Sequence, residues 1–127
     1  MINVQKASNG KFTQRLDVNG HELFADVSIE NGGDNVGPDP HSLLDAALGA
    51  CTGLTLTMVA QRKQIPLKDV RVTITHTEEQ GVYQLDRKIE LIGELSEEQR
   101  AYLLGIANKC PIHKVLSGKI EIATNLV

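Results

Sequence analysis

The sequence contains no tryptophan, and aromatic residues make up only 3% of its 127 residues. Proteins that bind nucleic-acid bases by stacking need exposed aromatic rings, so this composition argues against such a surface. The chain also lacks a basic excess, because 13 Lys and Arg are outnumbered by 16 Asp and Glu, for a net charge of −3. Since phosphate binding depends on clustered Lys and Arg side chains, we expect no nucleic-acid partner.

A targeting or membrane-spanning segment is also missing from the pattern. Residues 1–10 show no basic stretch followed by an apolar one, as a secretory signal would. The longest uncharged stretch, residues 46–61, contains two glycines and three threonines. It falls short of the ~20 apolar residues that a membrane span needs. We therefore expect a cytoplasmic protein with no membrane partner, in which the cysteines are inert core residues or redox groups rather than a structural disulfide.

The composition is that of an ordinary folded domain. Hydrophobic residues make up 41% and charged residues 23% of the chain, which argues against wholesale disorder. A chain of 127 residues is long enough to bury a core without a metal or a disulfide. No internal repeat divides it. We expect residues 1–127 to form a single domain.

Turn patterns organise the N-terminal part of the chain. Asn19-Gly20 is a strong two-residue hairpin signal, and Asn9-Gly10 marks an earlier turn. Together they predict a meander of strands over residues 2–7, 11–18 and 21–27. Residues 30–40 are rich in Gly, Asn, Asp and Pro, which is the composition of a loop.

A long helix is predicted after this loop. Asp39 suits the N-cap position and Pro40 the first helical position. The pattern continues to about residue 63, and Pro66 prevents further extension. Residues 48–59 show no polar face, so the helix is predicted to be buried on every side.

Alternating strand and helix patterns fill the remainder of the chain. Residues 70–76 alternate as a half-buried strand does, and Gln80-Gly81 turns the chain into a second strand over 83–95. Ser96-Glu97-Glu98-Gln99 matches a capping box at a helix start. The later patterns predict a short helix over 111–117 and a last strand over 119–126. The predicted class is α+β, with antiparallel strands and a buried central helix.

Two cysteines carry the most suggestive chemistry. Cys51 lies in the middle of the long helix, where small residues at helical spacing leave room for a substrate to reach the sulfur. Cys110 precedes Pro111 and so stands at the start of the short helix, where backbone N–H groups favour a thiolate. Two inward-facing thiols fit a peroxidatic and resolving pair. The alternative is two unrelated core residues, since free cysteine is often simply packed.

A metal site is a further alternative. Cys110 and His113 have a C-x-x-H spacing, to which Cys51, His41 and His76 can add ligands. Structural zinc sites usually show two close ligand pairs and this chain has one, so we expect no metal. The patterns of a phosphate-binding loop and of a nucleophile elbow are absent.

The segments around the two cysteines resemble one known family. GPDPHSLLDAALGACTGLTLTMVAQRK (37–63) and KCPIHKVLSG (109–118) are similar to the OsmC/Ohr family of thiol-dependent hydroperoxide reductases. In that family a Gly-x-x-Pro loop leads into a central helix with the peroxidatic cysteine, and a later Cys-Pro supplies the resolving one. The resemblance covers nearly the whole chain and implies these roles for Cys51 and Cys110. It also implies an OsmC-like fold, an intertwined homodimer with sheets from both chains around paired central helices.

The resemblance implies further site residues. The family uses an Arg of the N-terminal strands to activate the thiolate, and Arg15 is the only Arg before the central helix, with Lys11 as the alternative. A carboxylate that tethers this Arg normally follows the Pro that opens the helix. Here that position is His41, which is either a weak, pH-sensitive tether or an exposed first-turn residue. Asp45, one turn later, is the candidate substitute.

The helix around Cys51 also supplies a candidate substrate pocket. Leu48 and Thr55 lie near the thiol at helical spacing, and further apolar side chains occur at Leu43, Leu44, Leu54 and Met58. Burial of an apolar group contributes ~0.8 kcal/mol per CH₂, so such a pocket favours bulky organic peroxides over hydrogen peroxide.

The sequence thus predicts thiol-dependent reduction of organic hydroperoxides by a homodimer with no bound cofactor. Cys51 becomes a sulfenic acid, Cys110 condenses with it to a disulfide, and an external dithiol reduces that disulfide. The family resemblance implies a lipoyl-bearing protein as this reductant. Two alternatives stay open: a low-turnover stress or apolar-ligand-binding protein of the same fold, and a thiol redox sensor.

Overall fold

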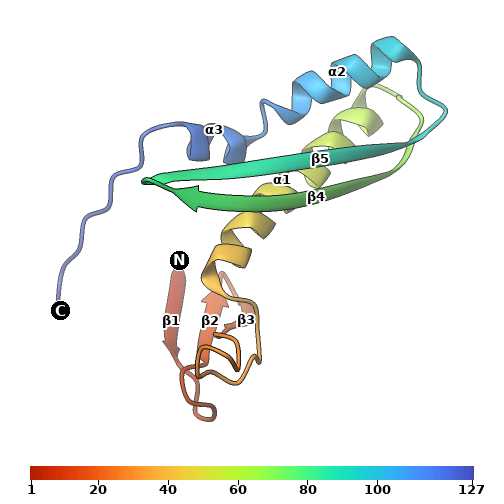
Figure 1. Cartoon of the computed structure of the whole chain (residues 1–127). Helices are drawn as coiled ribbons and strands as arrows, with labels where there is room; N and C mark the ends of the chain where they lie inside the picture. The colour runs from red at the N-terminus through yellow and green to blue at the C-terminus, as the bar shows by residue number, and fades with distance from the viewer. The chain divides into compact units, whose positions relative to one another are not determined.

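The computed structural model describes residues 1–127, which form two compact units, Met1–Leu44 and Asp45–Val127. In chain order the elements are β1 (Ile2–Lys6), β2 (Gln14–Val18), β3 (His21–Ala25), α1 (Pro40–Arg62), β4 (Leu67–Glu79), β5 (Val82–Gly93), α2 (Glu97–Ala107) and α3 (Pro111–Ser117) (Figure 1). The predicted α+β class with antiparallel sheets is confirmed.

The first unit is the predicted three-stranded meander with its loop. Its strand order is β1-β2-β3, both pairings are antiparallel, and the hairpin between β2 and β3 turns at Asn19-Gly20 with positive φ at both residues. Asp26, after β3, ties the loop back to the sheet, because its carboxylate accepts hydrogen bonds from the Thr13 hydroxyl and the Val36 N–H. A Cβ on Gly37 would lie 2.4 Å from the Phe24 carbonyl oxygen, so only glycine lets the loop pass this close to β3.

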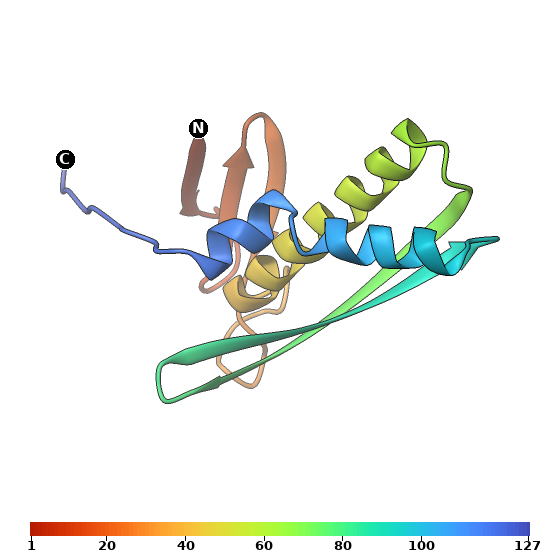
Figure 2. The same ribbon diagram turned by 90° about the horizontal axis from the view of Figure 1, so that it is seen from above.

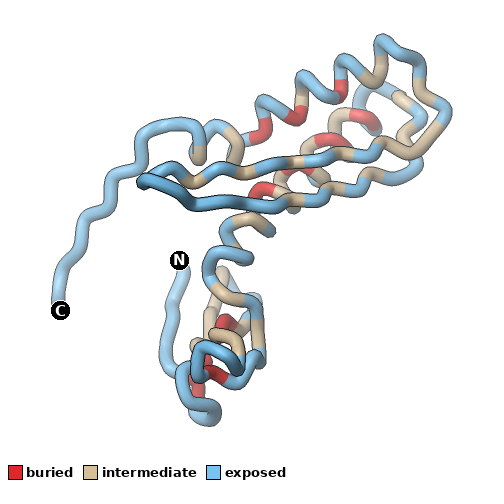
Figure 3. Tube along the Cα trace, viewed as in Figure 1, coloured by how far each residue is buried: buried red, intermediate tan, exposed pale blue.

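The second unit is built on a long hairpin. β4 and β5 pair antiparallel, with Leu67 opposite Gly93 and Glu79 opposite Val82, around a turn at Gln80-Gly81. Alternate residues of β5 are partly buried, and helices α1 and α2 lie on the same side of the hairpin (Figure 2). The core of this unit joins α1 to α2 through Leu56, Ala60, Leu103 and Ala107, with partly buried residues of both strands against it (Figure 3).

Helix ends follow the local signals. Leu43 N–H bonds to the Asp39 carbonyl oxygen, and the Asp39 carboxylate accepts from the first turn, so Asp39 caps α1 as predicted. Ser96 and Gln99 form the predicted reciprocal capping box at the start of α2.

Burial of α1 differs from the sequence-based expectation. Only one face is buried, by Leu48, Thr52, Leu56 and Ala60, while Leu54 and Met58 are 64% and 54% exposed. The reason is that α2 and the β4–β5 hairpin both pack against this one face. The helix is also long and apolar enough to cross a membrane by length and composition, so the sequence-based exclusion of a span was too strong. Leu56 and Ala60 on its buried face pack against α2 and the hairpin.

The predicted last strand is absent. Residues 118–127 after α3 have no regular secondary structure and are exposed. A strand forms only where a neighbouring strand accepts its backbone hydrogen bonds, and neither sheet of this chain includes this segment. The alternating residues Ile120, Ile122 and Leu126 are therefore exposed and form no strand in this structure.

Candidate active site

Cys51 lies in the middle of α1, next to the buried Thr52. It is partly buried, and its Sγ lies 3.9 Å from the Thr55 hydroxyl one turn later. The next residue, Thr52, is fully buried, and its hydroxyl donates to the Leu48 carbonyl oxygen at 2.7 Å. Because the Thr52 hydroxyl uses its hydrogen in this bond, its oxygen can also accept a hydrogen bond from another side chain.

Cys110 is the N-cap of α3 and is fully buried. Its Sγ accepts a hydrogen bond from the His113 backbone N–H at 3.3 Å. Burial raises the pKa of the Cys110 thiol, but four interactions act in the opposite direction, and the pKa lies below its ordinary value. In order of size these are the His113 N–H, the Cys51 and Thr52 side chains, and the positive charge of Arg87.

Arg87 on β5 connects the two cysteine-bearing elements. One terminal nitrogen donates to the Thr52 hydroxyl at 3.0 Å and to Cys110 Sγ at 3.9 Å. The other contacts Asn108 Oδ1 at 3.1 Å and His113 Nδ1 at 3.0 Å. Arg87 therefore lies at Cys110 and at the Thr52 hydroxyl, next to Cys51 in sequence, and the Cys51 side chain is among the groups that lower the pKa of Cys110. In this cluster a thiolate at Cys110 is stabilised by the positive charge of Arg87.

A cavity of about 240 Å³ adjoins this cluster. Arg87 and His113 supply its polar wall, and its other lining residues are Leu48, Tyr83, Leu85, Leu116 and Ser117. Its lining is part polar and part apolar, and Arg87 connects it to the cysteines, neither of which lines it. Such a space suits a small ligand with an apolar body and a polar end.

The N-terminal candidates lie in the first unit with partners of their own. Arg15 Nε pairs with Glu22 Oε2 at 2.9 Å across the β2–β3 hairpin, and both side chains are substantially exposed. Lys11 donates its backbone N–H to Asp34 at 2.7 Å. A role for either cation at the thiols stays a prediction.

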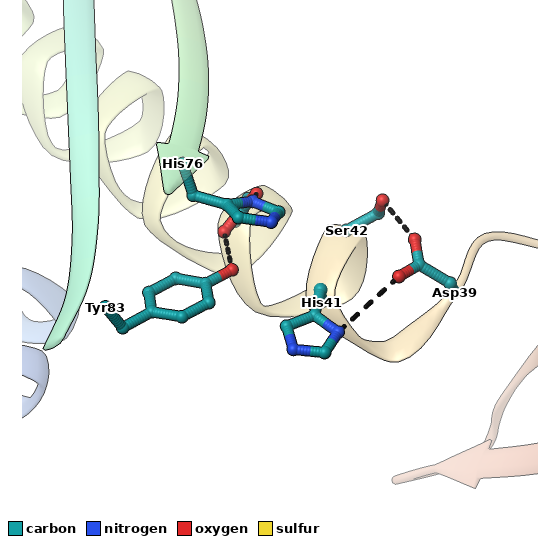
Figure 4. Close-up of polar contacts among 6 residues, drawn as sticks. Asp39, His41, Ser42, His76 and Tyr83 are labelled. Atoms are coloured by element: carbon teal, nitrogen blue, oxygen red, sulfur yellow. Dashed lines mark hydrogen bonds and ion pairs between the residues drawn. The ribbon is translucent and has the colours of Figure 1, made fainter. Parts of the chain in front are cut away.

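His41 lies beside the cap of α1. Its Nδ1 is 3.7 Å from the Asp39 carboxylate, and the Ser42 hydroxyl donates to the same carboxylate (Figure 4). The Ser42 hydrogen bond is the largest of the effects that hold the pKa of Asp39 below its ordinary value, and the His41 charge adds to it. This geometry fits the exposed first-turn interpretation of His41.

Asp45 lies in the second unit and bridges two strands. Its carboxylate accepts a hydrogen bond from the Tyr83 hydroxyl at 2.7 Å and contacts His76 Nδ1 at 2.5 Å. The His76 and Tyr83 rings stack, with centroids 4.9 Å apart, as Figure 4 shows for the two labelled side chains. Asp45 therefore joins α1 to both strands of the hairpin, which is a structural role not anticipated from the sequence.

Arg87 is the site residue that the sequence reasoning missed. β5 alternates, and Tyr83, Leu85, Arg87 and Ile89 share its partly buried face. A single Arg among inward-facing apolar residues is the signal that identifies it, because a buried guanidinium needs partners. Among the histidines considered as metal ligands, His113 alone contacts the cluster, and no three His, Cys, Asp or Glu side chains are grouped to hold a metal ion.

Comparison with known proteins places this geometry in context. No curated protein matches the sequence. Among solved structures, an OsmC-like protein from Mycoplasma pneumoniae superposes with a TM-score of 0.76 at 18% identity, over 93% of this chain and 86% of that one. An organic hydroperoxide resistance protein OsmC from Legionella pneumophila gives a TM-score of 0.61 at 23% identity, over 93% and 88% of the two chains.

A third structure extends the same likeness. The organic hydroperoxide resistance protein from Elizabethkingia anophelis, with thiocyanate bound, gives a TM-score of 0.65 at 22% identity, over 94% of this chain and 89% of that one. At these identities the structures show the fold alone. The family model described as OsmC-like protein, however, matches residues 32–125, which is most of the sequence. The chain therefore belongs to the OsmC-like family, which includes proteins of organic hydroperoxide resistance.

Proposed function

We propose that this protein reduces organic hydroperoxides, with Cys51 as the peroxidatic and Cys110 as the resolving cysteine. The observation that carries the proposal is that Arg87 on β5 contacts Cys110 at the start of α3 and Thr52 on α1, the residue next to Cys51. The Cys51 side chain also helps to lower the pKa of Cys110, so the two thiols act on each other beside a cation, which a structural core does not require. Proteins named for hydroperoxide resistance share this fold.

The reaction uses the accessible sulfur first. Cys51 is partly exposed whereas Cys110 is fully buried, so the peroxide meets Cys51. The Cys51 thiolate attacks the outer peroxide oxygen, the O–O bond breaks, and the alkoxide leaves and takes up a proton to give the alcohol. Cys51 is then a sulfenic acid. The Cys110 thiolate attacks its sulfur, the hydroxyl leaves as water with a proton, and a disulfide forms.

The leucine side chains in the cavity beside Arg87 support the organic part of the substrate assignment. Leu48, Leu85 and Leu116 line it next to Arg87, so an alkyl or aryl group fits there while the peroxide oxygens meet the polar wall. Regeneration requires an external dithiol, for which a lipoyl-bearing protein is the proposed source. We also propose that the protein acts in the cytoplasm as a homodimer.

Peroxide consumption by single-cysteine variants tests the function. Reduced wild type mixed with cumene hydroperoxide should consume it and end as the Cys51–Cys110 disulfide. Cys51→Ser should abolish consumption, and Cys110→Ser should give one turnover followed by sulfenic and sulfinic acid at Cys51. Ser42→Ala, at the cap of α1 in the first unit, is the matched control and should behave as wild type.

Each alternative function has its own outcome in this assay. If both thiols are free after treatment and no cumyl alcohol is formed, the protein is not a peroxidase, and the apolar-ligand-binding function is favoured instead. If the peroxide oxidises each protein to the disulfide once and a dithiol does not support further turnover, the redox-sensor function is favoured instead.

A further inference from the structure

A cation without a carboxylate partner lies at the thiol cluster. The four hydrogen bonds of Arg87 go to a hydroxyl, an amide oxygen, an imidazole nitrogen and the Cys110 sulfur. Arginine stays protonated at every pH at which a protein is folded. Of its four partners, only the Cys110 thiol becomes an anion by losing a proton, so Cys110 is the group that balances its charge.

The two sulfurs differ in the way that matters for disulfide exchange. Cys110 Sγ is fully buried, contacts Arg87 and accepts the His113 N–H. Cys51 is partly exposed, its Sγ lies 3.9 Å from the neutral Thr55 hydroxyl, and Arg87 makes its contacts with Thr52 and Cys110 instead. An external thiolate can therefore reach Cys51 more easily than Cys110. A negative charge on sulfur is stabilised at Cys110, because Arg87 contacts that sulfur. In thiol–disulfide exchange the sulfur that leaves fastest is the one more stable as a thiolate.

We propose that Arg87 makes Cys110 the leaving sulfur during reduction, so that the external dithiol attacks the Cys51–Cys110 disulfide only at Cys51. This inference rests on the proposed function and adds a direction to its regenerating half-reaction. One thiolate of the dithiol forms a bond to Cys51 Sγ, the disulfide bond breaks, and its electron pair stays on Cys110 as a thiolate facing Arg87. The second thiolate of the reductant then attacks the reductant sulfur that is bonded to Cys51. The mixed disulfide breaks and Cys51 leaves as a thiolate, so the dithiol is oxidised by two electrons and the protein is reduced.

The site of attack is mapped directly on the wild-type chain. The disulfide is prepared with diamide, so that the test does not depend on peroxide activity. It is then exposed to the monothiol 2-mercaptoethanol, which forms a mixed disulfide but cannot close on itself, and the free thiol is blocked with N-ethylmaleimide in acid. Mass spectrometry of the peptides should find 2-mercaptoethanol on Cys51 and maleimide on Cys110. The reverse pattern, or an even mixture, would overturn the proposal.

Substitution of Arg87 tests the cause of the direction. Arg87→Met should slow reduction of the disulfide by dithiothreitol on the order of tenfold at neutral pH, because the leaving thiolate loses its cation. Arg87→Lys should retain most of the rate. Arg71→Met is the matched control, since Arg71 on β4 pairs with Asp69 and Glu90 at an exposed site.

A second readout separates charge from structural damage. In a Cys51→Ser background the thiolate absorbance at 240 nm reports Cys110 alone, and Arg87→Met should move its titration to higher pH while Arg87→Lys should not. A wild-type reduction rate and titration in Arg87→Met would refute the role of Arg87 and leave the peroxide chemistry standing. Failure of peroxide to form the disulfide at all would instead refute the proposed function.

Discussion

At the scale of single residues, the candidate site depends on one hydroxyl as much as on the two thiols. Thr52 is fully buried, donates to the Leu48 carbonyl and accepts from Arg87. Its oxygen is thereby satisfied in both directions, as buried polar groups usually are. It also fixes one arm of the guanidinium beside Cys110, so a residue with no redox chemistry of its own determines where the cation lies.

Replacement of Thr52 isolates this contribution. Thr52→Val keeps the shape of the side chain but removes one of the four acceptors of Arg87, so we expect a loss of about 1–3 kcal/mol in the free energy of unfolding. The titration of Cys110 should also move to higher pH, because an interaction that lowers its pKa is lost. Thr52→Ser retains the hydroxyl and should keep the wild-type titration. Urea unfolding and thiolate absorbance measure the two effects, and a Val variant with an unchanged titration would contradict this account.

The pKa of Cys110 also predicts how stability depends on pH. Since the pKa of this thiol is lower in the folded chain than the ordinary value of 9.0, folding favours the thiolate. Its contribution is complete above the ordinary pKa and is lost as pH falls through the folded-state pKa. The melting temperature of the reduced wild type, relative to that of reduced Cys110→Ala, should therefore rise as the pH is raised from below the folded-state pKa toward the ordinary value of 9.0. The oxidised wild type provides the control, because a disulfide sulfur does not titrate, and a pH-independent difference for the reduced pair would contradict the assignment.

At the scale of secondary-structure elements, three of them meet at the cavity. α1 contributes Leu48, β5 contributes Leu85 and Arg87, and α3 contributes Leu116. Each element is placed by a local signal, namely a cap, a turn or a proline. The cavity, in contrast, results from their packing together in the second unit.

Truncation of the cavity wall tests its role in substrate choice. Leu116→Ala should lower the rate constant for cumene hydroperoxide while leaving that for hydrogen peroxide nearly unchanged, because only the organic peroxide has apolar surface to bury there. The loss of three carbon atoms of contact corresponds to roughly 2 kcal/mol, or about 30-fold, if the contact is fully made in the transition state. Val115→Ala, which shortens a 55% exposed residue of the same helix, is the control. Equal losses for both peroxides would show that this wall does not contact the substrate.

At the scale of the whole molecule, the single chain leaves apolar surface uncovered. Leu54 and Met58 project from the exposed face of α1, and the alternating residues Ile120 and Ile122 are 58% and 86% exposed. Exposed apolar patches of this kind mark interaction surfaces. The homodimer that we propose would cover the exposed face of α1 and could pair with residues 119–126.

Charged substitutions on α1 test this assembly. Wild type should sediment as a dimer at micromolar concentration, whereas Leu54→Glu or Met58→Glu should shift it toward monomer, because a carboxylate buried in an apolar interface is strongly unfavourable. Lys88→Glu changes an 81% exposed side chain on β5 and serves as the control for charge alone. A monomeric wild type, or dimeric Glu variants, would place the interface elsewhere or remove it.

The sequence by itself determined the local architecture. Asn19-Gly20 and Gln80-Gly81 adopt positive φ in tight turns, Asp39 and Ser96 cap their helices, and the element order follows from these signals. Backbone conformation and capping involve residues only a few positions apart, so they can be predicted from the order of residues. The position of Cys110 could be predicted in the same way, because the residue before a proline at a helix start is the N-cap.

Only the tertiary structure decided which groups meet at the thiols. Arg87 is 35 positions from Thr52 and 23 from Cys110 along the chain, and the packing of α1 and the start of α3 against β5 brings the three together. The same packing joins Asp45 to His76 and Tyr83, and it leaves one face of α1 exposed although its composition predicts burial all round. Such contacts depend on how whole elements pack, which no short segment encodes. The apolar composition of α1 favours burial of its whole surface, but the packing of the other elements determines which face is covered.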